Sequence, residues 1–284
     1  MSRVVIVTGA GRGIGRAHAL AFGAAGYRVV VNDLSAAVAG EVAELIGPRA
    51  VVNTDDVGTW AGAQRLVEAA VSEFGGLDVL VNNAGIVRDR MVVSCAEDEW
   101  DEVVRVHLKG HFATLHHAAA HWRGVAKAGG RVSGRVINTS SGAGLFGSVG
   151  QANYSAAKAG IASMTLVAAA ELARYGITVN AIAPAARTRM TEATFADMMA
   201  APEDGFDAMA PENISPLVVW LGSEEAGDVT GRMFEVDGGR VCVVHGWRRG
   251  PEVDKGSRWS PDELGAVVRK LVADDHPVPV YGAE

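Results

Sequence analysis

Short apolar runs alternate with longer helical stretches along most of this sequence, and this alternation limits the folds that the chain can adopt. The runs are rich in β-branched residues and apolar throughout, which is typical of strands buried on both faces. The segments between them carry apolar residues at helical spacing. We therefore predict an α/β fold, a doubly wound parallel sheet of about seven strands. The predicted strands lie at 4–7, 28–31, 50–52, 77–81, 135–137, 177–182 and 232–236, with the main helices at 14–25, 61–74, 97–122 and 154–174.

The composition allows one large core and excludes several kinds of partner. Apolar residues make up 49% of the 284 residues, and no internal repeat divides them. The formal net charge of -7 argues against nucleic acid, because phosphate binding requires a basic surface. Only Cys95 and Cys242 carry thiols, as expected in a reducing cytosol. The first apolar run is too short for a signal peptide or a membrane span, so we expect a cytoplasmic protein with no membrane partner.

A glycine-rich turn follows the first predicted strand and precedes the first helix. Its sequence, Thr8-Gly9-Ala10-Gly11-Arg12-Gly13-Ile14-Gly15, fits T-G-x-x-x-G-x-G rather than G-x-G-x-x-G. Glycines here let the backbone approach a pyrophosphate, and the helix N-terminus favours its negative charge. The turn predicts a Rossmann-type dinucleotide site that includes Gly9, Arg12, Gly13, Ile14 and Gly15.

An acidic residue follows the second predicted strand, in the sequence Asn32-Asp33-Leu34. Asp33 lies 20 residues beyond Gly13, where a carboxylate that binds the adenosine ribose hydroxyls is expected. This carboxylate would repel the 2′-phosphate of NADP, whereas Arg12 would attract it. We therefore predict NAD as the cofactor, with Asp33 and Leu34 in its site. Asp33 can also cap the helix that begins near Ser35, and the two roles are compatible.

Three later segments carry groups suited to acid–base chemistry. One predicted strand ends in a tight turn that we place beside the cofactor, Asn83-Ala84-Gly85, and another ends in Ser140-Ser141. Tyr154 and Lys158 lie one turn apart on one face of the next helix. A tyrosine with a pKa of about 10 is a poor base, but a neighbouring ammonium and the positive nicotinamide ring lower that pKa. Tyr154 can then accept the alcohol proton, while Lys158 also holds the nicotinamide ribose.

Together these motifs resemble the short-chain dehydrogenase/reductase family over residues 3–240. In that family the catalytic serine lies thirteen residues before the tyrosine, which selects Ser141 over Ser140. The resemblance also implies adenine contacts at Asp56 and Val57 and a nicotinamide carboxamide contact at Thr188. It further implies a homo-oligomer, a dimer or tetramer built on the helices at 97–122 and 154–174.

Two positions depart from the family's pattern. Pro184-Ala185-Ala186 replaces the usual Pro-Gly, so we expect a differently shaped nicotinamide loop. His107 replaces an asparagine that supports a proton-relay water in the family. A histidine there is similar to the (3R)-hydroxyacyl-CoA dehydrogenase domains of multifunctional β-oxidation enzymes, as are the stretches at 30–34, 151–154 and 188–191. His107 is either a relay, whose protonation would depress oxidation through the histidine pH range, or a packed residue.

Five histidines crowd the helix at 97–122, and His107 and His111 have the i, i+4 spacing of zinc ligands. No acidic or cysteine third ligand is evident near them, so we predict no metal. Residues 241–284 form an extension of the cofactor-binding domain, 1–240. In the extension, Ser260, Pro261 and Glu263 form a capping-box start. An apolar stripe follows, which we expect to pack on the core or a neighbouring subunit: Leu264, Val267, Val268, Leu271 and Val272.

The sequence thus predicts an NAD-dependent enzyme that interconverts a secondary alcohol and a ketone. A bulky apolar small molecule, such as a 3-hydroxyacyl-CoA or a hydroxysteroid, would be its substrate, covered by the methionine-rich segment 189–215. Cations at 247–249 and 255–259 could meet an anionic handle such as the phosphates of coenzyme A. Two alternatives stay open: a 3-oxoacyl-carrier-protein reductase that uses NADPH, and a nucleotide-sensing binding protein without chemistry. The intact set of Ser141, Tyr154 and Lys158 argues against the latter.

Overall fold

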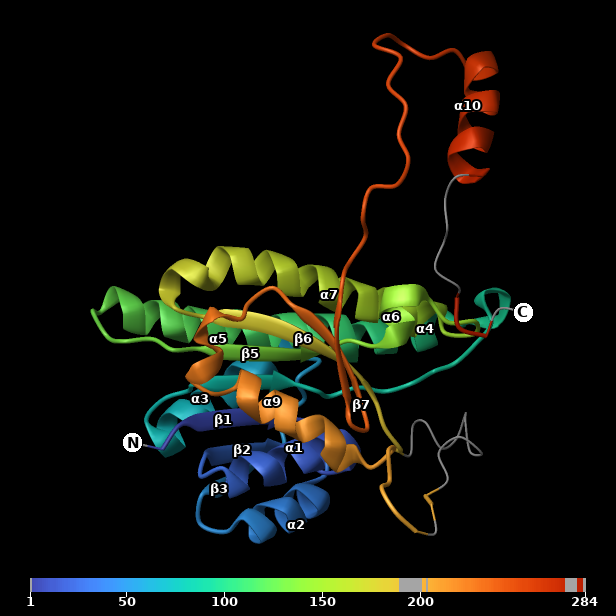
Figure 1. The fold of residues 1–284 in the computed structure, drawn as a ribbon. Helices are drawn as coiled ribbons and strands as arrows, with labels where there is room; N and C mark the ends of the chain where they lie inside the picture. Colours follow the sequence, from blue (N-terminus) through green and yellow to red (C-terminus); the bar gives the residue numbers. More distant parts are fainter. Residues whose placement is uncertain (1, 189–200, 203, 274–279, 283–284) are drawn as a thin grey trace.

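A twisted sheet forms the centre of the molecule, with helices on both of its faces (Figure 1). The computed structural model describes residues 2–188, 201–202, 204–273 and 280–282. Within them the sheet has eight strands in the order β3-β2-β1-β4-β5-β6-β7-β8, and every pair is parallel except β7 with β8. The strands are β1 (Val4–Thr8), β2 (Arg28–Asn32), β3 (Ala50–Asn53), β4 (Val79–Asn82), β5 (Arg135–Thr139), β6 (Thr178–Ala185), β7 (Met233–Asp237) and β8 (Arg240–Val244).

The helices follow the predicted ones closely. The α-helices are α1 (Gly13–Ala24), α2 (Ala36–Ile46), α3 (Trp60–Phe74), α4 (Glu97–Val104), α5 (Gly110–Lys127), α6 (Gly142–Phe146), α7 (Ala152–Leu172), α9 (Ser215–Leu221) and α10 (Pro261–Ala273). A π-helical turn, η2 (Arg105–Lys109), joins α4 to α5, so the single helix expected over 97–122 contains one wider turn. Short 3-10 helices are η1 (Val92–Ser94), η3 (Ala173–Tyr175), η5 (Pro211–Ile214) and η6 (Glu225–Asp228).

Each face of the sheet has its own hydrophobic core, and β1 contributes alternate residues to the two. Val5 and Val7 pack with Phe22 of α1 and Leu221 of α9 in one core. Val4 and Ile6 point to the other, which residues of α3, α5 and α7 complete. All five residues of β1 are buried. This burial on both faces explains why the strands are apolar throughout rather than alternating.

The eighth strand, β8, was not predicted. It pairs with β7 in an antiparallel hairpin across Gly238, whose φ is +47. Val241 and Val243 of β8 are 55% and 48% exposed, because β8 is the edge strand. The sheet therefore continues past residue 240 into the first residues of the predicted extension, 241–284.

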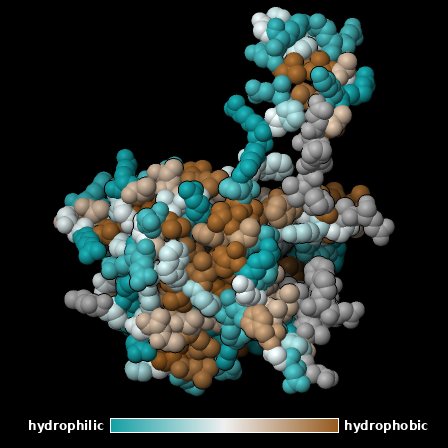
Figure 2. Space-filling view, viewed as in Figure 1, coloured by the Kyte–Doolittle hydropathy of each residue, from teal (hydrophilic) through white to brown (hydrophobic). Residues whose placement is uncertain are grey.

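An arm formed by residues 245–273 leaves the body of the molecule (Figure 1). It ends in α10, where one half of the predicted capping box is present: the Glu263 carboxylate accepts from the Ser260 backbone N–H at 2.8 Å, and the Ser260 hydroxyl donates to the same carboxylate at 3.0 Å. No residue of α10 is buried, and its apolar side chains are exposed at the end of the arm (Figure 2). The helix therefore does not pack on its own core, and a neighbouring subunit remains as the predicted partner of its stripe. Lys255, one of the predicted coenzyme A contacts, pairs with Glu263 instead.

Candidate active site

The predicted motifs meet at one edge of the sheet, at the carboxyl ends of β1, β4 and β5. The strand order reverses between β1 and β4, which are neighbours in the sheet although two strands separate them in the sequence. Crevices at such a reversal are where open α/β sheets bind their ligands. The glycine turn follows β1, the Asn83-Ala84-Gly85 turn follows β4, and Ser141 follows β5.

The glycine turn has the geometry of a phosphate cradle. Gly9 and Gly13 have φ values of +62 and +50, which favour glycine. A side chain at Gly15 would meet the carbonyl oxygen of Gly9 at 2.1 Å, so α1 packs directly on the turn. The β4 turn holds it in place, since the Asn83 amide donates to the Thr8 carbonyl at 2.9 Å. The Ala84 N–H donates to the Thr8 hydroxyl at 3.0 Å.

The N-terminus of α1 is suited to an anion. Arg12 is its N-cap residue, and no side chain caps the first turn. These N–H groups and the helix dipole fit a pyrophosphate. Thr188, predicted at the nicotinamide carboxamide, lies at the same place: a methyl group at Gly13 would be 3.3 Å from the Thr188 Cγ2. Ile14, on the first turn, is partly buried against the core.

Asp33 joins the end of β2 to the glycine turn. Its Oδ2 accepts from the Gly11 N–H at 3.1 Å, and its Oδ1 accepts from the Ser35 N–H at 3.0 Å. The second of these bonds holds the backbone of Ser35, the N-cap residue of α2, and the ribose role of Asp33 stays a prediction. Further lone pairs on the two oxygens stay available for ribose hydroxyls. Leu34 is 68% exposed beside it, and Arg12 is exposed on the glycine turn.

Asp56 and Val57, the predicted adenine contacts, lie just after β3. The Asp56 carboxylate accepts from the Gly58 N–H at 2.8 Å and pairs with Arg105 at 2.7 Å. Val57 is 7% exposed and belongs to the core beneath α3. The ion pair links the loop after β3, where the adenine is predicted to bind, to the π-helical turn that carries His107.

Ser141, Tyr154 and Lys158 are brought together by β5 and α7. Ser141 is the N-cap residue of α6, and its Oγ accepts from the Ala143 N–H at 3.2 Å. Tyr154 lies in the first turn of α7, partly exposed. Lys158, one turn later, is buried: its Nζ donates to the Thr139 carbonyl at 2.6 Å and lies 5.5 Å from the centroid of the Tyr154 ring. Ser140 is used differently, since its hydroxyl donates to the Lys158 carbonyl at 2.8 Å.

The electrostatics of this set differ from the sequence expectation. Burial lowers the pKa of Lys158 to about 7. Burial also raises the pKa of Tyr154, although a hydrogen bond with Ser141 opposes this. The expected lowering of the Tyr154 pKa by the lysine ammonium is therefore not found here: desolvation of the phenolate is the largest cause, and the opposing group is Ser141. A lowered pKa of Tyr154 would therefore depend on the positive charge of the nicotinamide ring.

His107 is buried inside the π-helical turn next to Tyr154. Its Nε2 lies 2.7 Å from the Ile86 carbonyl oxygen, while its buried Nδ1 has no hydrogen-bond partner among the described residues. Gly85 makes room for the ring, since a methyl group there would lie 2.3 Å from the His107 Cε1. Burial, with a smaller effect of the Lys158 charge, lowers the pKa of His107 to about 3. A loss of activity through the ordinary histidine range is thus not expected from this residue.

The histidines of α5, which follow His107 along the chain, lie in different surroundings. His111 is buried, and burial lowers its pKa well below the usual value. The rings of His116 and His117 lie 4.7 Å and 4.9 Å from the ring of Trp60 on α3. In the described part of the chain, no group of three or more histidine, cysteine or acidic side chains has a metal-binding arrangement.

A buried polar network beneath the site was missed by sequence reasoning. The Asn82 amide donates to the Asn138 side chain at 3.0 Å, and Asn138 donates to Thr165 of α7 at 3.0 Å. These contacts fix the ends of β4 and β5 against the helix that carries Tyr154 and Lys158. The sequence signal for this network was a polar residue near the end of each apolar strand, Asn82 in β4 and Asn138 in β5. Of the segment expected to cover the substrate, 189–215, residues 189–200 and 203 lie outside the described residues.

Known proteins share this arrangement over most of the chain. The short chain dehydrogenase family model matches residues 3–199. A hydroxyacyl-CoA dehydrogenase, ChsB1, of Mycobacterium tuberculosis is 44% identical over 99% of this chain and 92% of its own. The peroxisomal multifunctional enzyme type 2 of Mus musculus is 41% identical over 94% of this chain, which spans 34% of that enzyme. A short chain dehydrogenase crystal structure from Mycobacterium avium is 61% identical, with a TM-score of 0.91, over 99% of this chain and 98% of its own.

Proposed function

Because the chain belongs to the short-chain dehydrogenase family, we propose that it oxidises the hydroxyl of a 3-hydroxyacyl-CoA to a ketone with NAD. That it is an oxidoreductase follows from the family and from its dehydrogenase relatives. The observation that carries the proposal is the meeting of Ser141, Tyr154 and Lys158 beside a dinucleotide cradle. A binding protein without chemistry is therefore set aside.

Each residue has a distinct role in the oxidation. The nicotinamide ring, when bound, accepts the hydride. Tyr154, in its phenolate form, accepts the proton of the substrate alcohol, and the Ser141 hydroxyl orients the substrate oxygen. Lys158 holds the nicotinamide ribose, since its ammonium has two donors besides the one used by the Thr139 carbonyl. Its charge, together with that of the ring, favours the phenolate against the cost of burial.

The substrate class rests on the relatives. The hydroxyacyl-CoA dehydrogenase of M. tuberculosis matches along nearly its whole length, and multifunctional enzymes match over the part of their chains that this chain spans. Hydroxysteroids are the second candidate substrates, because they too present a secondary alcohol on a bulky apolar frame.

NAD is supported by Asp33. Two backbone N–H groups hold its carboxylate at the end of β2. A 2′-phosphate there would face this negative charge in a partly buried position. The exposed Arg12 favours the alternative of an NADPH-dependent 3-oxoacyl-carrier-protein reductase, and a Synechocystis protein of that name is 39% identical over 84% of this chain.

The decisive experiment is an absorbance screen for NADH or NADPH formation. The purified protein receives either cofactor with 3-hydroxyacyl-CoAs of both configurations, with hydroxysteroids, and with a 3-hydroxyacyl-carrier protein. We expect the highest kcat/KM with NAD and an acyl-CoA. A preference for NADP and the carrier protein would overturn the proposal in favour of the reductase.

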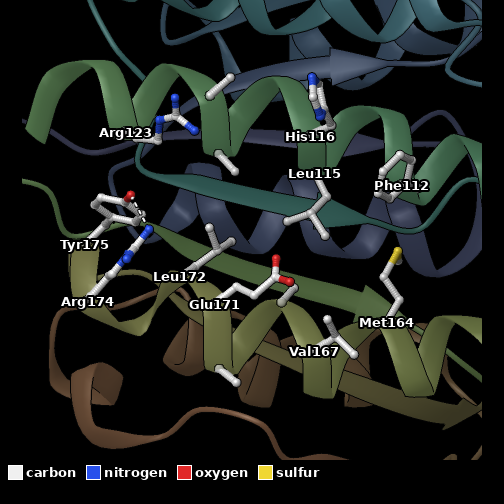
Figure 3. Close-up of a pocket in the computed structure, with 14 residues that line it drawn as sticks. Phe112, Leu115, His116, Arg123, Met164, Val167, Glu171, Leu172, Arg174 and Tyr175 are labelled. Carbon is white, nitrogen blue, oxygen red and sulfur yellow. Dashed lines mark hydrogen bonds between the residues drawn. The ribbon is translucent and has the colours of Figure 1, made fainter. Parts of the chain in front are cut away.

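We also propose that the chain forms a homo-oligomer through α5 and α7. These helices line an exposed apolar groove of about 710 Å³, with Phe112 and Leu115 on α5 facing Met164 and Val167 on α7 (Figure 3). Val167 is 54% exposed, and a contiguous apolar surface of this kind marks an interaction site. The same apolar face gives 152–175 the length and composition of a membrane-crossing helix, but Tyr154 and Lys158 on it belong to the active site.

A cytoplasmic location is proposed on the thiols alone. Cys95 is partly buried and Cys242 exposed, and both are unpaired. Free exposed thiols suit a reducing compartment. Fractionation of cells that express a tagged chain would test this, with recovery in a membrane or secreted fraction as the contrary result.

A further inference from the structure

The last described residues of the chain, 280–282, return to the body at the active site. The Val149 N–H donates to the Tyr281 carbonyl at 2.9 Å, and the Tyr281 N–H donates to the Gly147 carbonyl at 3.2 Å. These two bonds add Tyr281 as a parallel β-bridge to Ser148. The chain thus closes on the short segment between Ser141 and Tyr154.

The Tyr281 ring lies on the residue next to the catalytic serine. A methyl group at Gly142 would be 2.8 Å from the Tyr281 Cε2 and 3.0 Å from its hydroxyl oxygen. On its other side the ring packs edge to face with Phe146, with centroids 5.9 Å apart. Gly142 is therefore the residue type that this contact requires.

Part of the Tyr281 side chain remains available to a ligand. Tyr281 is 47% exposed, and its hydroxyl makes no hydrogen bond to the residues that the structure describes. A half-exposed ring with an unused donor resembles the aromatic anchors that proteins use for recognition. Its bonds to 147–149 hold the ring in place, so little ordering would be needed on binding.

Substrate must pass close to this ring. An alcohol that contacts the Ser141 and Tyr154 hydroxyls is bordered by the residues that connect them, 142–153. Tyr281 covers the first of these, so the part of a substrate that extends past Gly142 meets the phenol. An alkyl chain of only a few carbons would end before reaching it.

We propose that Tyr281 is a specificity-determining residue, whose ring and hydroxyl contact the part of a large substrate that lies beyond the carbinol carbon. The inference rests on the oxidation assigned above, but not on the acyl-CoA as its substrate. This role would explain why the chain carries an arm, because Tyr281 follows the arm in the sequence and contacts the site.

The test compares a large with a small substrate in the full-length chain. For Tyr281→Ala we expect kcat/KM with 3-hydroxypalmitoyl-CoA to fall about tenfold or more, mainly through KM, and kcat/KM with 3-hydroxybutyryl-CoA to change less than about threefold. Tyr281→Phe should keep most of the activity on the large substrate, because the ring remains. The KM for NAD should stay unchanged in both variants. Val253→Ala, a 49% exposed position of the arm outside the apolar stripe of α10, is the matched control.

The outcomes separate this inference from the proposed function. An unchanged ratio between large and small substrates in Tyr281→Ala, at an unchanged melting temperature, would overturn it. Equal losses on both substrates with a lowered melting temperature would also overturn it, because they indicate a structural role. If the unaltered chain oxidises no acyl-CoA, the proposed substrate fails, and the same ratio is measured with a hydroxysteroid and butan-2-ol.

Discussion

The imidazole of His107 meets the phenol of Tyr154 edge to face, with ring centroids 5.2 Å apart and ring planes at 89°. The histidine is itself fixed by the Ile86 carbonyl, and Gly85 leaves the space that its ring fills. The π-helical turn therefore supports the ring of Tyr154, the proposed proton acceptor. An asparagine at 107 could make the bond to Ile86 but could not supply the ring contact.

The first prediction concerns this pair. His107→Ala should lower kcat by about tenfold or more, because the tyrosine loses its support and the Ile86 carbonyl its partner. His107→Asn should lower it less. Since the pKa of His107 is about 3, the ring stays neutral, and the pH–rate profile between about pH 5 and pH 7 should be the same in His107→Asn as in the unaltered protein. An acidic limb that only the unaltered protein shows would identify His107 as a titrating relay.

Tyr154→Phe tests the proton transfer directly. The change keeps the ring but removes the acid–base group, so kcat should fall by about two or more orders of magnitude. Cofactor binding, followed by fluorescence titration with NADH, should be unchanged. Lys158→Met should lower both kcat and the affinity for NADH, because Lys158 also holds the ribose in the proposed arrangement. Retention of most activity by Tyr154→Phe would show that another group carries the proton.

The cofactor prediction concerns the carboxylate at the end of β2. We expect the unaltered protein to prefer NAD over NADP by at least about tenfold in kcat/KM, or about 1.4 kcal/mol. Asp33→Ala should reduce the preference for NAD, because the 2′-phosphate of NADP can then bind next to Arg12. Adding Arg12→Ala to this variant should restore part of the preference for NAD. Equal use of both cofactors by the unaltered protein would count against Asp33 as the selector.

Much of the fold and the polar residues of the site could be predicted from sequence, for different physical reasons. Strands such as β1 are buried on both faces, so their apolar runs are unambiguous. The comparisons confirm the short-chain dehydrogenase family, which was inferred from Gly9 to Gly15, Ser141, Tyr154 and Lys158. They also confirm the resemblance to hydroxyacyl-CoA dehydrogenases, which was inferred from His107 and the stretches at 30–34, 151–154 and 188–191.

What could not be predicted depends on contacts between distant residues. The edge strand β8 is half-exposed and short, so its pattern did not separate it from the arm. The contact of Tyr281 with Gly142 joins residues 139 positions apart. The net pKa of Tyr154 reflects burial, which its helical spacing from Lys158 does not reveal.

The buried Lys158 should make the stability of the cofactor-free protein depend on pH in the alkaline range. Its pKa is about 7 when folded against 10.5 ordinarily, so between these values the unfolded chain binds a proton that the folded chain lacks. The free energy of unfolding should therefore rise as pH increases from about 7 towards 10. Urea unfolding of Lys158→Met should show higher stability at pH 7 and a flatter pH dependence. An identical slope in both proteins would mean that Lys158 does not titrate in this range.

The last prediction concerns the groove between α5 and α7. Val167→Glu places a carboxylate in a largely apolar surface, four residues from Glu171, which also lines the groove. If a second copy covers this surface, the new charge would be buried without a partner in the complex, at a cost of several kcal/mol. Association should weaken by about a hundredfold or more, and sedimentation should show smaller species at micromolar concentration. Leu45→Glu, on α2 and 64% exposed, is the matched control and should leave the mass unchanged. A Val167→Glu protein with the same mass and melting temperature as the unaltered chain would exclude this groove as the subunit interface.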